Sequence, residues 1–386
     1  FWLKARGCTP MRDRTTTQCK HSMDAWMPRS LRPLLVLTLA CVRGSSAGTA
    51  SFLQTGQKKS GSCVSIPAET GVDDIAYSMM TERICKINWV LSNKATMRWV
   101  DVKSVGCWKL LAFNTDNYMS SGVYQNQNDN RCTLVFSGYH GKLVGGMKAI
   151  SDTVQIPPKK VQMCGNNMYE PFVKLMRRHF SLANWSNVAE ALGGRGTTCS
   201  DISVTAESMG GSAAEILAGC ANMGQLETLQ NKSLPSFKIS SLFTFGGIGP
   251  STEPIKNPSR SDGCFPGMRF FISGDMYAGL GKTIGLHHSR MDATEIFHTS
   301  SGVSRRIYSC QSDDAVNDSK HKAPPASEAL AMLTGNADAT NHEITTYKKD
   351  LELFHNISWE DKGRPESENP NRVQQPRRVL GLFGKR

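Results

Sequence analysis

Helix-like and strand-like segments alternate along most of the chain. Apolar residues recur at helical spacing in residues 73–91, which open with two Asp residues, and again in residues 169–180. Residues 127–130 (QNDN) are typical of a turn between two hairpin strands. Short runs rich in β-branched and aromatic residues predict strands at residues 108–113, 122–125, 132–136, 202–205, 241–245 and 268–273, and a further helix is expected at residues 212–223. This alternation favours an α/β fold with a mostly parallel central sheet flanked by helices.

The composition is that of a globular protein. Of the 386 residues, 39% are hydrophobic and 20% are charged, which provides for a sizeable core and excludes a disordered or fibrous chain. The length fits one large domain or two ordinary ones. No apolar run is long enough to predict a membrane-spanning helix.

The net charge of +12 is concentrated at the two ends of the chain. Residues 1–47 carry +6 and residues 360–386 carry +3, so the middle of the chain carries only +3. No basic stripe with interleaved aromatic residues occurs in that middle part, and we therefore expect no nucleic-acid partner. Residues 360–386 are rich in Pro, Arg and Glu without an apolar period, which predicts a disordered basic tail.

The leader has the layout of a secretory signal peptide. The chain begins with Phe, and we expect translation to start at Met23 or Met27. Basic residues then precede the apolar run 34–42 (LLVLTLACV), and small residues at 45–47 (SSA) suit a cleavage site. Residues 1–47 are thus predicted to be a leader and residues 48–359 the folded domain of a secreted, extracellular protein.

Cysteine usage agrees with secretion. Nine of the 12 Cys residues follow residue 47, are widely spread and form no CxxC pair, which argues against a zinc knuckle or a thioredoxin-like site. We expect disulfides among these nine residues, although nine is an odd number, and the spacing does not determine which Cys pairs with which. Asn-x-Ser sequons, which predict a glycoprotein if the chain is secreted, begin at Asn184, Asn231, Asn317 and Asn356.

The most informative segment is residues 202–223 (ISVTAESMGGSAAEILAGCANM). A predicted strand leads into Ser208 and a predicted helix follows it at once. A nucleophilic serine on such a sharp turn needs small residues two positions before and after it, and Ala206 and Gly210 meet this need. The following helix directs its N-terminal dipole at the site, and the N–H of Met209 is an expected oxyanion donor. An ordinary turn with a capping Ser is the alternative.

This segment resembles the Gly-His-Ser-Leu-Gly-Gly-Ala elbow of the class 3 (fungal-type) lipases, in the α/β-hydrolase superfamily. Four more segments resemble that family in the same order: 132–138 (CTLVFSG), 163–175 (MCGNNMYEPFVKL), 241–250 (SLFTFGGIGP) and 268–275 (MRFFISGD). The resemblance covers about residues 105–350. It implies an α/β-hydrolase fold and a serine hydrolase that cleaves carboxylic esters, with lipid acyl esters as the favoured substrates.

The chain departs from the family pattern in three places. Ala206 replaces the usual Gly, and Glu207 replaces the usual His, which puts an extra carboxylate near the site. Tyr139 and His140 replace the small polar residues that usually follow Phe-x-Gly. These departures put substrate preference and, to a lesser extent, activity in doubt.

The acid and the base of a triad must follow the serine in this superfamily. Asp275 comes directly after a predicted strand and is the favoured acid, while Asp262 and Asp292 lie in polar stretches. The base must lie later, and His342 resembles the family's late His with an aromatic residue a few positions on. The alternatives, among which His321 comes next, are His287, His288, His298, His321 and His355.

The backbone N–H of Tyr139 is expected to be the second oxyanion donor, since this residue follows the strand that ends in Phe-Ser-Gly. Residues 141–150 (GKLVGGMKAI) occupy the place of the lid in the resembling lipases and suit a mobile cover. A plain surface loop is the alternative.

Two other motifs are set aside. Residues 274–283 (GDMYAGLGKT) end like a phosphate-binding loop, but Met276 stands where that motif needs its first Gly. His287 and His288 are adjacent and point apart in a helix or a strand, so they are poor ligands for one shared metal ion. The sequence implies no metal or organic cofactor.

Two classes of function remain. The first is an ester hydrolase with the triad Ser208, Asp275 and His342 and the oxyanion donors Met209 and Tyr139, acting on a small-molecule ester or at a lipid interface, with transient contact to a membrane or lipid-droplet surface. A variant of this first class is a carboxylesterase that acts on non-lipid esters, such as a feruloyl-type esterase. The second is a catalytically inactive binding protein with the lipase fold, which Glu207 and the Tyr139-His140 pair motivate.

Overall fold

In a computed structural model of the 386-residue chain, the described residues are 73–92, 104–116, 119–138, 158–196, 198–230, 234–317 and 342–355. All of them belong to one compact unit that spans Gly61–Arg386. The predicted leader, the tail and the predicted lid at residues 141–150 lie outside the described residues.

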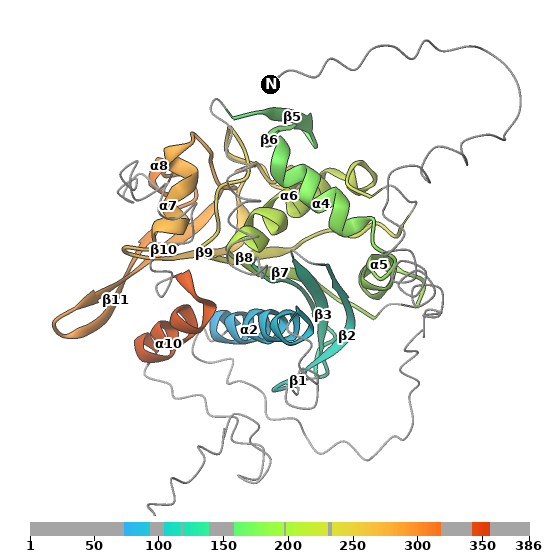
Figure 1. Ribbon diagram of the computed structural model, residues 1–386, viewed down its shortest axis with the longest axis horizontal. Helices are drawn as coiled ribbons and strands as arrows, with labels where there is room; N and C mark the ends of the chain where they lie inside the picture. Colours follow the sequence, from blue (N-terminus) through green and yellow to red (C-terminus); the bar gives the residue numbers. More distant parts are fainter. Residues whose placement is uncertain are drawn as a thin grey trace, which may run out of the picture. The chain divides into compact units, whose positions relative to one another are not determined.

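One large sheet forms the centre of the described part (Figure 1). Within these residues it has nine strands in the order β1-β2-β3-β4-β7-β8-β9-β10-β11. Their bounds are β1 Ser104–Val105, β2 Trp108–Thr115, β3 Ser120–Asn126, β4 Cys132–Phe136, β7 Ile202–Glu207, β8 Ser241–Phe245, β9 Phe265–Ile272, β10 Met291–Thr299 and β11 Gly302–Tyr308. A separate hairpin consists of β5 Lys160–Met163 and β6 Asn166–Tyr169.

The middle of the sheet is parallel and its edges are antiparallel. Strands β4, β7, β8, β9 and β10 pair in parallel, whereas β1–β2, β2–β3, β3–β4 and β10–β11 pair antiparallel. The register sets Ala206 of β7 opposite Phe136 of β4 and Thr244 of β8. Because parallel strands end at the same edge of a sheet, the residues that follow β4, β7, β8 and β9 gather at one edge.

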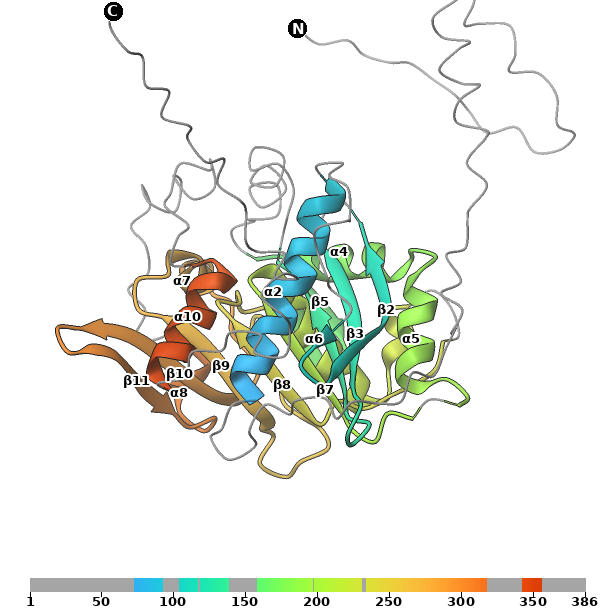
Figure 2. The ribbon, with the colours of Figure 1, turned by 90° about the horizontal axis from the view of Figure 1, so that it is seen from below.

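Helices cover both faces of this sheet. Two helices, α2 and α10, lie side by side across one face (Figure 2). The opposite face packs against α4, α5, α6 and α7 in the larger core cluster. The bounds are α2 Asp73–Ser92, α4 Glu170–Phe180, α5 Trp185–Gly193, α6 Met209–Met223, α7 Met276–Thr283, α8 Asp313–Asn317 and α10 Ile344–Phe354, with a short 3₁₀ helix η4 at Leu226–Thr228. No helix among the described residues is both long enough and apolar enough to span a membrane.

The predicted α/β architecture with a mostly parallel central sheet is confirmed, and the bounds of β4 and β8 coincide with the predicted ones. The predicted helix at residues 212–223 starts three residues earlier, at Met209, because the chain turns sharply at Ser208 and enters the helix without a linker. The segment that ends like a phosphate-binding loop forms α7 instead. The hairpin of β10 and β11 was not predicted.

Disulfides cross-link the domain, as the cysteine usage predicts. Three bridges join Cys132 to Cys199, Cys164 to Cys220 and Cys264 to Cys310. Cys107 is also disulfide-bonded. Among the described cysteines, Cys85 of α2 is the free one, and it is buried.

Candidate active site

Ser208 occupies a strained turn between β7 and α6. Its φ is 55° and its ψ is −131°, a backbone conformation that L-residues rarely adopt and that costs of order 1–3 kcal/mol. Two hydrogen bonds hold the turn: the Ser208 N–H donates to the carbonyl of Phe245 at 2.9 Å, and the Gly211 N–H donates to the carbonyl of Ser208 at 2.9 Å. The sequence analysis predicts this geometry of strand, serine and helix.

The close approach of neighbouring strands explains the small residues around this turn. A Cβ atom at Gly210 would lie 2.4 Å from the carbonyl oxygen of Ser137, just after β4. A Cβ atom at Gly211 would lie 3.0 Å from the Cα of Gly247, just after β8. Ala206 is fully buried between the two neighbouring strands. The turn therefore fits only because its residues leave room for the ends of β4 and β8.

The structure brings Ser208, His342 and Asp275 together from three separate parts of the chain. Nε2 of His342 lies 2.7 Å from Ser208 Oγ, and Nδ1 lies 3.0 Å from both carboxylate oxygens of Asp275. Because an ionised carboxylate only accepts hydrogen bonds, Nδ1 carries the proton and Nε2 is left to accept the hydroxyl proton of Ser208. The side chain of His342 is 12% exposed, and that of Asp275 is buried.

Asp275 is fixed by groups on both sides. It is the N-cap of α7, and its Oδ1 accepts the backbone N–H groups of Tyr277 at 3.0 Å and Ala278 at 3.2 Å. Its Oδ2 accepts the hydroxyl of Tyr347 at 2.6 Å, and that hydroxyl in turn accepts the N–H of Ile272 at 3.2 Å. The sequence pattern includes an aromatic residue after the late His but does not predict this contact of Tyr347 with Asp275.

Gly246 leaves the space in which these side chains meet. Its φ is +58°, and a Cβ atom there would lie 2.9 Å from Asp275 Oδ2, 2.9 Å from the Tyr347 hydroxyl and 3.2 Å from His342 Nδ1. The position follows β8, where the sequence showed a Gly pair. A glycine is therefore required both by the backbone conformation and by the crowded acid–base pair.

Burial and charge act in opposite directions on His342. Burial lowers the pKa of its imidazole. The pKa is nevertheless raised overall, because the charge of Asp275, the hydrogen bond to Asp275 and the charges of Glu207 and Glu343 together outweigh burial. The ring of Tyr277 lies 4.5 Å from the imidazole, centroid to centroid. The imidazole therefore sits in a pocket that favours its protonated form, as a group that receives a proton during a reaction requires.

One of the two predicted oxyanion donors is described. Met209 is the first residue of α6, so its N–H has no acceptor within the helix. This N–H lies at the N-terminal end of α6, which Ser208 caps, and a negative charge is stabilised there. Tyr139 lies outside the described residues. Gly138, which precedes it, packs directly beside the nucleophile, since a Cβ atom there would lie 3.0 Å from Ser208 Cβ.

The alternative acids and bases make other contacts. Asp262 accepts two hydrogen bonds from Arg260 on the exposed surface, and Asp292 accepts the backbone N–H of Cys310. His321 lies outside the described residues, and His355 caps the C-terminus of α10.

The remaining histidines also belong to other contacts. His288 is buried 2.8 Å from Glu215, and His298 lies 3.0 Å from Asp350. The backbone N–H of His287 donates to Ser251, which ties its loop to another part of the chain.

No protein-family model matches the chain, and comparison with curated protein sequences finds no relative. Among solved structures, the chain is similar to the triacylglyceride lipase of Rhizomucor miehei, with 16% identity, 69% of this chain and 97% of that chain covered, and a TM-score of 0.45. It is also similar to lipase II from Rhizopus niveus (18% identity, 65% and 92% covered, TM-score 0.42) and to the Lip2 lipase of Yarrowia lipolytica (14% identity, 74% and 95% covered, TM-score 0.44).

These likenesses concern the fold alone, because identity this low assigns no activity to any residue. The predicted mostly parallel central sheet with helices on both faces is confirmed by the strand pairing and helix packing of the chain itself. The roles of Ser208, Asp275, His342, Met209 and Tyr139 stay predictions.

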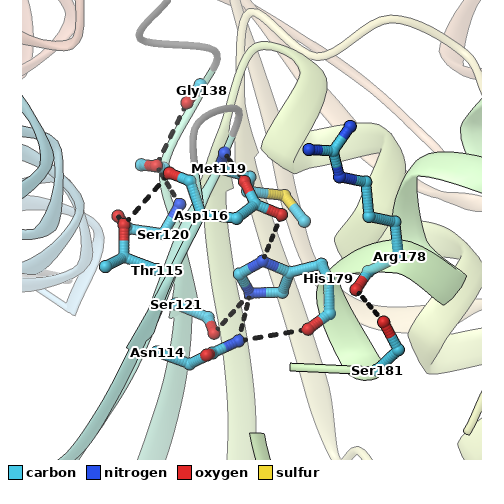
Figure 3. A network of polar contacts seen from close by, with 11 residues as sticks. Asn114, Thr115, Asp116, Met119, Ser120, Ser121, Gly138, Arg178, His179 and Ser181 are labelled. Atoms are coloured by element: carbon cyan, nitrogen blue, oxygen red, sulfur yellow. Dashed lines mark hydrogen bonds and ion pairs between the residues drawn. The ribbon is translucent and has the colours of Figure 1, made fainter. Parts of the chain in front are cut away.

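A second contact between a serine, a histidine and an aspartate lies inside the protein, with Ser121 and His179 fully buried and the Asp116 side chain 5% exposed (Figure 3). Nε2 of His179 lies 2.8 Å from Ser121 Oγ and 3.0 Å from Asn114 Nδ2, and Nδ1 lies 3.3 Å from Asp116 Oδ2. The same types of residue therefore occur here as at Ser208, but His179 and Ser121 have no exposed surface at all. A buried hydroxyl cannot meet a substrate, so this network is structural.

A second set of hydrogen bonds beside the His179 network joins the ends of β2 and β4 to the start of β3. The Ser120 N–H donates to Ser137 Oγ at 2.8 Å, and Thr115 Oγ1 lies 2.7 Å from Ser120 Oγ (Figure 3). The Ser137 hydroxyl in turn donates to the carbonyl of Gly138 at 3.0 Å. No sequence signal predicts these contacts, since the residues that make them are distant in sequence and carry no motif. Within the described residues, no group of three or more His, Cys, Asp or Glu side chains is arranged to hold a metal ion.

Proposed function

We propose that the protein is a secreted serine hydrolase that cleaves carboxylic esters through an acyl-enzyme on Ser208. The observation that carries the proposal is the pair of contacts on His342, with Ser208 Oγ 2.7 Å from Nε2 and Asp275 3.0 Å from Nδ1. A nucleophile, a base and a group that orients the base thus lie in one hydrogen-bonded row.

In the acylation step, Ser208 Oγ attacks the ester carbonyl carbon while its proton moves to Nε2 of His342. The electron pair of the carbonyl π bond moves to the oxygen, and the Met209 N–H, with the Tyr139 N–H as the proposed second donor, stabilises this oxyanion. Loss of one such donor costs about 3–4 kcal/mol of barrier. The oxyanion then re-forms the carbonyl, the bond to the alkoxy oxygen breaks, and His342 gives its proton to the departing alcohol.

In the deacylation step, a water molecule attacks the acyl-enzyme and passes a proton to His342. The bond between the carbonyl carbon and Ser208 Oγ then breaks, and the proton returns to Ser208. Asp275 stays ionised throughout and holds the imidazole in the tautomer that leaves Nε2 free to accept. The Tyr347 hydroxyl and the N-terminus of α7 stabilise that carboxylate.

Lipid acyl esters are the favoured substrates, on the strength of the sequence resemblance to class 3 lipases. A water-soluble ester and an emulsified long-chain ester distinguish a small-molecule substrate from one bound at a lipid surface. The disulfides, three of which join two described cysteines, support a protein that matures in an oxidising compartment, as secreted proteins do. The sequon at Asn184 lies at the exposed N-cap of α5, where a glycan is sterically acceptable.

The test is covalent labelling of the secreted protein with a fluorophosphonate, which reacts only with an activated serine. We expect the parent chain to be labelled, and the Ser208→Ala and His342→Ala variants to remain folded without label. A panel of esters of increasing acyl length then defines the substrate class.

The alternative of a catalytically inactive binding protein rests on the unusual Glu207 beside the nucleophile. Absence of labelling in a folded parent chain, with detergent added to displace any cover over the site, favours that alternative and rejects the hydrolase. Equal labelling of the parent and the Ser208→Ala variant rejects Ser208 as the nucleophile.

A further inference from the structure

Glu207, the residue before the proposed nucleophile, points away from α6. Because side chains alternate along a strand, Ala206 faces α6 and Glu207 faces α2 on the other side of the sheet. There the thiol of Cys85 donates a hydrogen bond to Glu207 Oε2 at 3.2 Å. The carboxylate is thus buried directly behind Ser208, with 7% of the residue exposed.

The same carboxylate reaches the end of β4. Its Oε2 packs closely against Gly138, just after the end of β4. A Cβ atom at Gly138 would lie 3.0 Å from Glu207 Oε2 and 3.0 Å from Ser208 Cβ. The three residues are therefore in mutual contact, and Glu207 fills the space between the end of β4 and α2.

Negative charge surrounds the imidazole of His342 on more than one side. Asp275 bonds it directly, and the charge of Glu207 acts on it from β7. Burial and the charge of Asp275 raise the pKa of Glu207 overall, while the charge of His342 and the hydrogen bond from Cys85 oppose that rise. Glu207 and the imidazolium of His342 therefore stabilise each other's charged forms. The other titratable groups around the pair are Cys85 and Glu82 on α2, Tyr277 on α7, and Glu343, Tyr347 and Lys348 on α10.

The neighbouring thiol and hydroxyl act as donors and add no charge. Burial raises the pKa values of Cys85 and Tyr347 well above their ordinary values, and the nearby carboxylates raise both further. Glu82 is neutralised by Lys348, whose Nζ lies 3.0 Å from its carboxylate. Asp275 and Glu207 are therefore the carboxylates whose charges matter most at His342, ahead of the more exposed Glu343.

We propose that Glu207 is a positioning residue of this site, which holds the end of β4 against Ser208 and provides a second negative charge that stabilises the imidazolium of His342. The part of this proposal that concerns catalysis rests on the proposed hydrolase function. In the resembling lipases a His stands at this position, so the second carboxylate belongs to this chain and not to the family pattern. The charge favours proton transfer from Ser208 to His342 and delays deprotonation of the imidazolium.

The decisive experiment is an NMR titration of the His342 ring, assigned with a His342→Gln variant. We expect the pKa of His342 to fall by roughly 0.5 unit or more in Glu207→Gln, which keeps the shape of the side chain and removes its charge. Glu207→Asp, which keeps the charge, should retain most of the parent value. Glu295→Gln is the matched control, because it removes a largely buried carboxylate that hydrogen-bonds Tyr308 and Arg306 in another part of the fold.

A His342 pKa in Glu207→Gln that coincides with the parent value overturns the proposal, as does an equal shift in Glu295→Gln. If Glu207→Gln fails to fold, Glu207→His, the residue type of the resembling lipases, takes its place with the same expected direction. In the active enzyme the acid limb of the profile of kcat/KM against pH should move to lower pH by the same amount. A merely structural Glu207 lowers Tm and kcat/KM and leaves that limb in place.

The titration separates this proposal from the hydrolase proposal. A parent chain that fails fluorophosphonate labelling rejects the hydrolase, while the NMR titration still decides whether Glu207 stabilises the charged imidazole. A labelled parent with an unshifted His342 in Glu207→Gln keeps the hydrolase and rejects the role of Glu207.

Discussion

Removing the hydroxyl of Tyr347 tests how Asp275 is held. In Tyr347→Phe the ring keeps its place in the core, but two hydrogen bonds are lost: the 2.6 Å bond to Asp275 Oδ2 and the 3.2 Å bond from the Ile272 N–H. A hydrogen bond to a charged group contributes about 1.5–3 kcal/mol, and a buried N–H left without a partner costs about 1–3 kcal/mol. We therefore expect the free energy of unfolding to fall by about 3 kcal/mol.

The rate should fall much less than it would without Asp275. The carboxylate keeps the hydrogen bonds from the N–H groups of Tyr277 and Ala278 and from His342, so it continues to orient the imidazole. We expect kcat/KM to fall about tenfold, which corresponds to about 1.4 kcal/mol of transition-state stabilisation.

Urea denaturation and hydrolysis of a soluble nitrophenyl ester measure the two effects separately. Tyr308→Phe is the matched control, since its buried hydroxyl also donates to a carboxylate, Glu295, at 2.7 Å. It should lose comparable stability and keep its kcat/KM at a temperature where both variants are folded. Equal kcat/KM in the two variants, or a loss of a thousandfold or more in Tyr347→Phe, would refute this account of how Asp275 is held.

Two further predictions concern the base and the turn at Ser208. Burial lowers the pKa of His342, but the charges of Asp275 and Glu207 raise it by more. Because kcat/KM needs the neutral imidazole, it should fall toward acid pH with a midpoint above about 6.5, and a lower midpoint in the pH–rate profile would contradict this charge arrangement. Gly210→Ala places a Cβ atom 2.4 Å from the carbonyl oxygen of Ser137, so we expect the free energy of unfolding to fall by roughly 3 kcal/mol and fluorophosphonate labelling to be lost. Gly224 has open space around it, so the Gly224→Ala control should lose only about 1 kcal/mol of unfolding free energy, because its φ is positive.

Local sequence patterns predicted the strands that have a buried and continuous apolar character. The bounds of β4 and β8 coincide with the prediction because both strands are short apolar runs with polar or Gly residues at their ends. The hairpin of β10 and β11 was missed, since its second strand carries exposed polar and basic residues at the edge of the sheet and shows little apolar alternation. Edge strands are stabilised by backbone pairing, which the side-chain pattern does not record.

For the candidate site, the sequence predicted the residues that need a special local backbone. Ser208 between small residues and Asp275 after an apolar strand each carry such a signal. The contacts of Tyr347, Cys85 and Glu207 carry none, because they join residues between 72 and 122 positions apart in the chain. Such contacts depend on the register of the sheet and on how helices lie across it, which no single segment specifies.

The alternation of side chains along β7 explains why a carboxylate at position 207 affects the site. The strand is buried on both faces, so the residue before Ser208 cannot point into solvent and must face α2. An apolar residue there would pack against α2 without consequence for the chemistry. A carboxylate instead needs a hydrogen-bond donor, which the Cys85 thiol supplies, and its charge then acts on the nearby imidazole. The departure at Glu207, which in the sequence suggested an inactive protein, therefore has a physical explanation that is compatible with a working serine hydrolase.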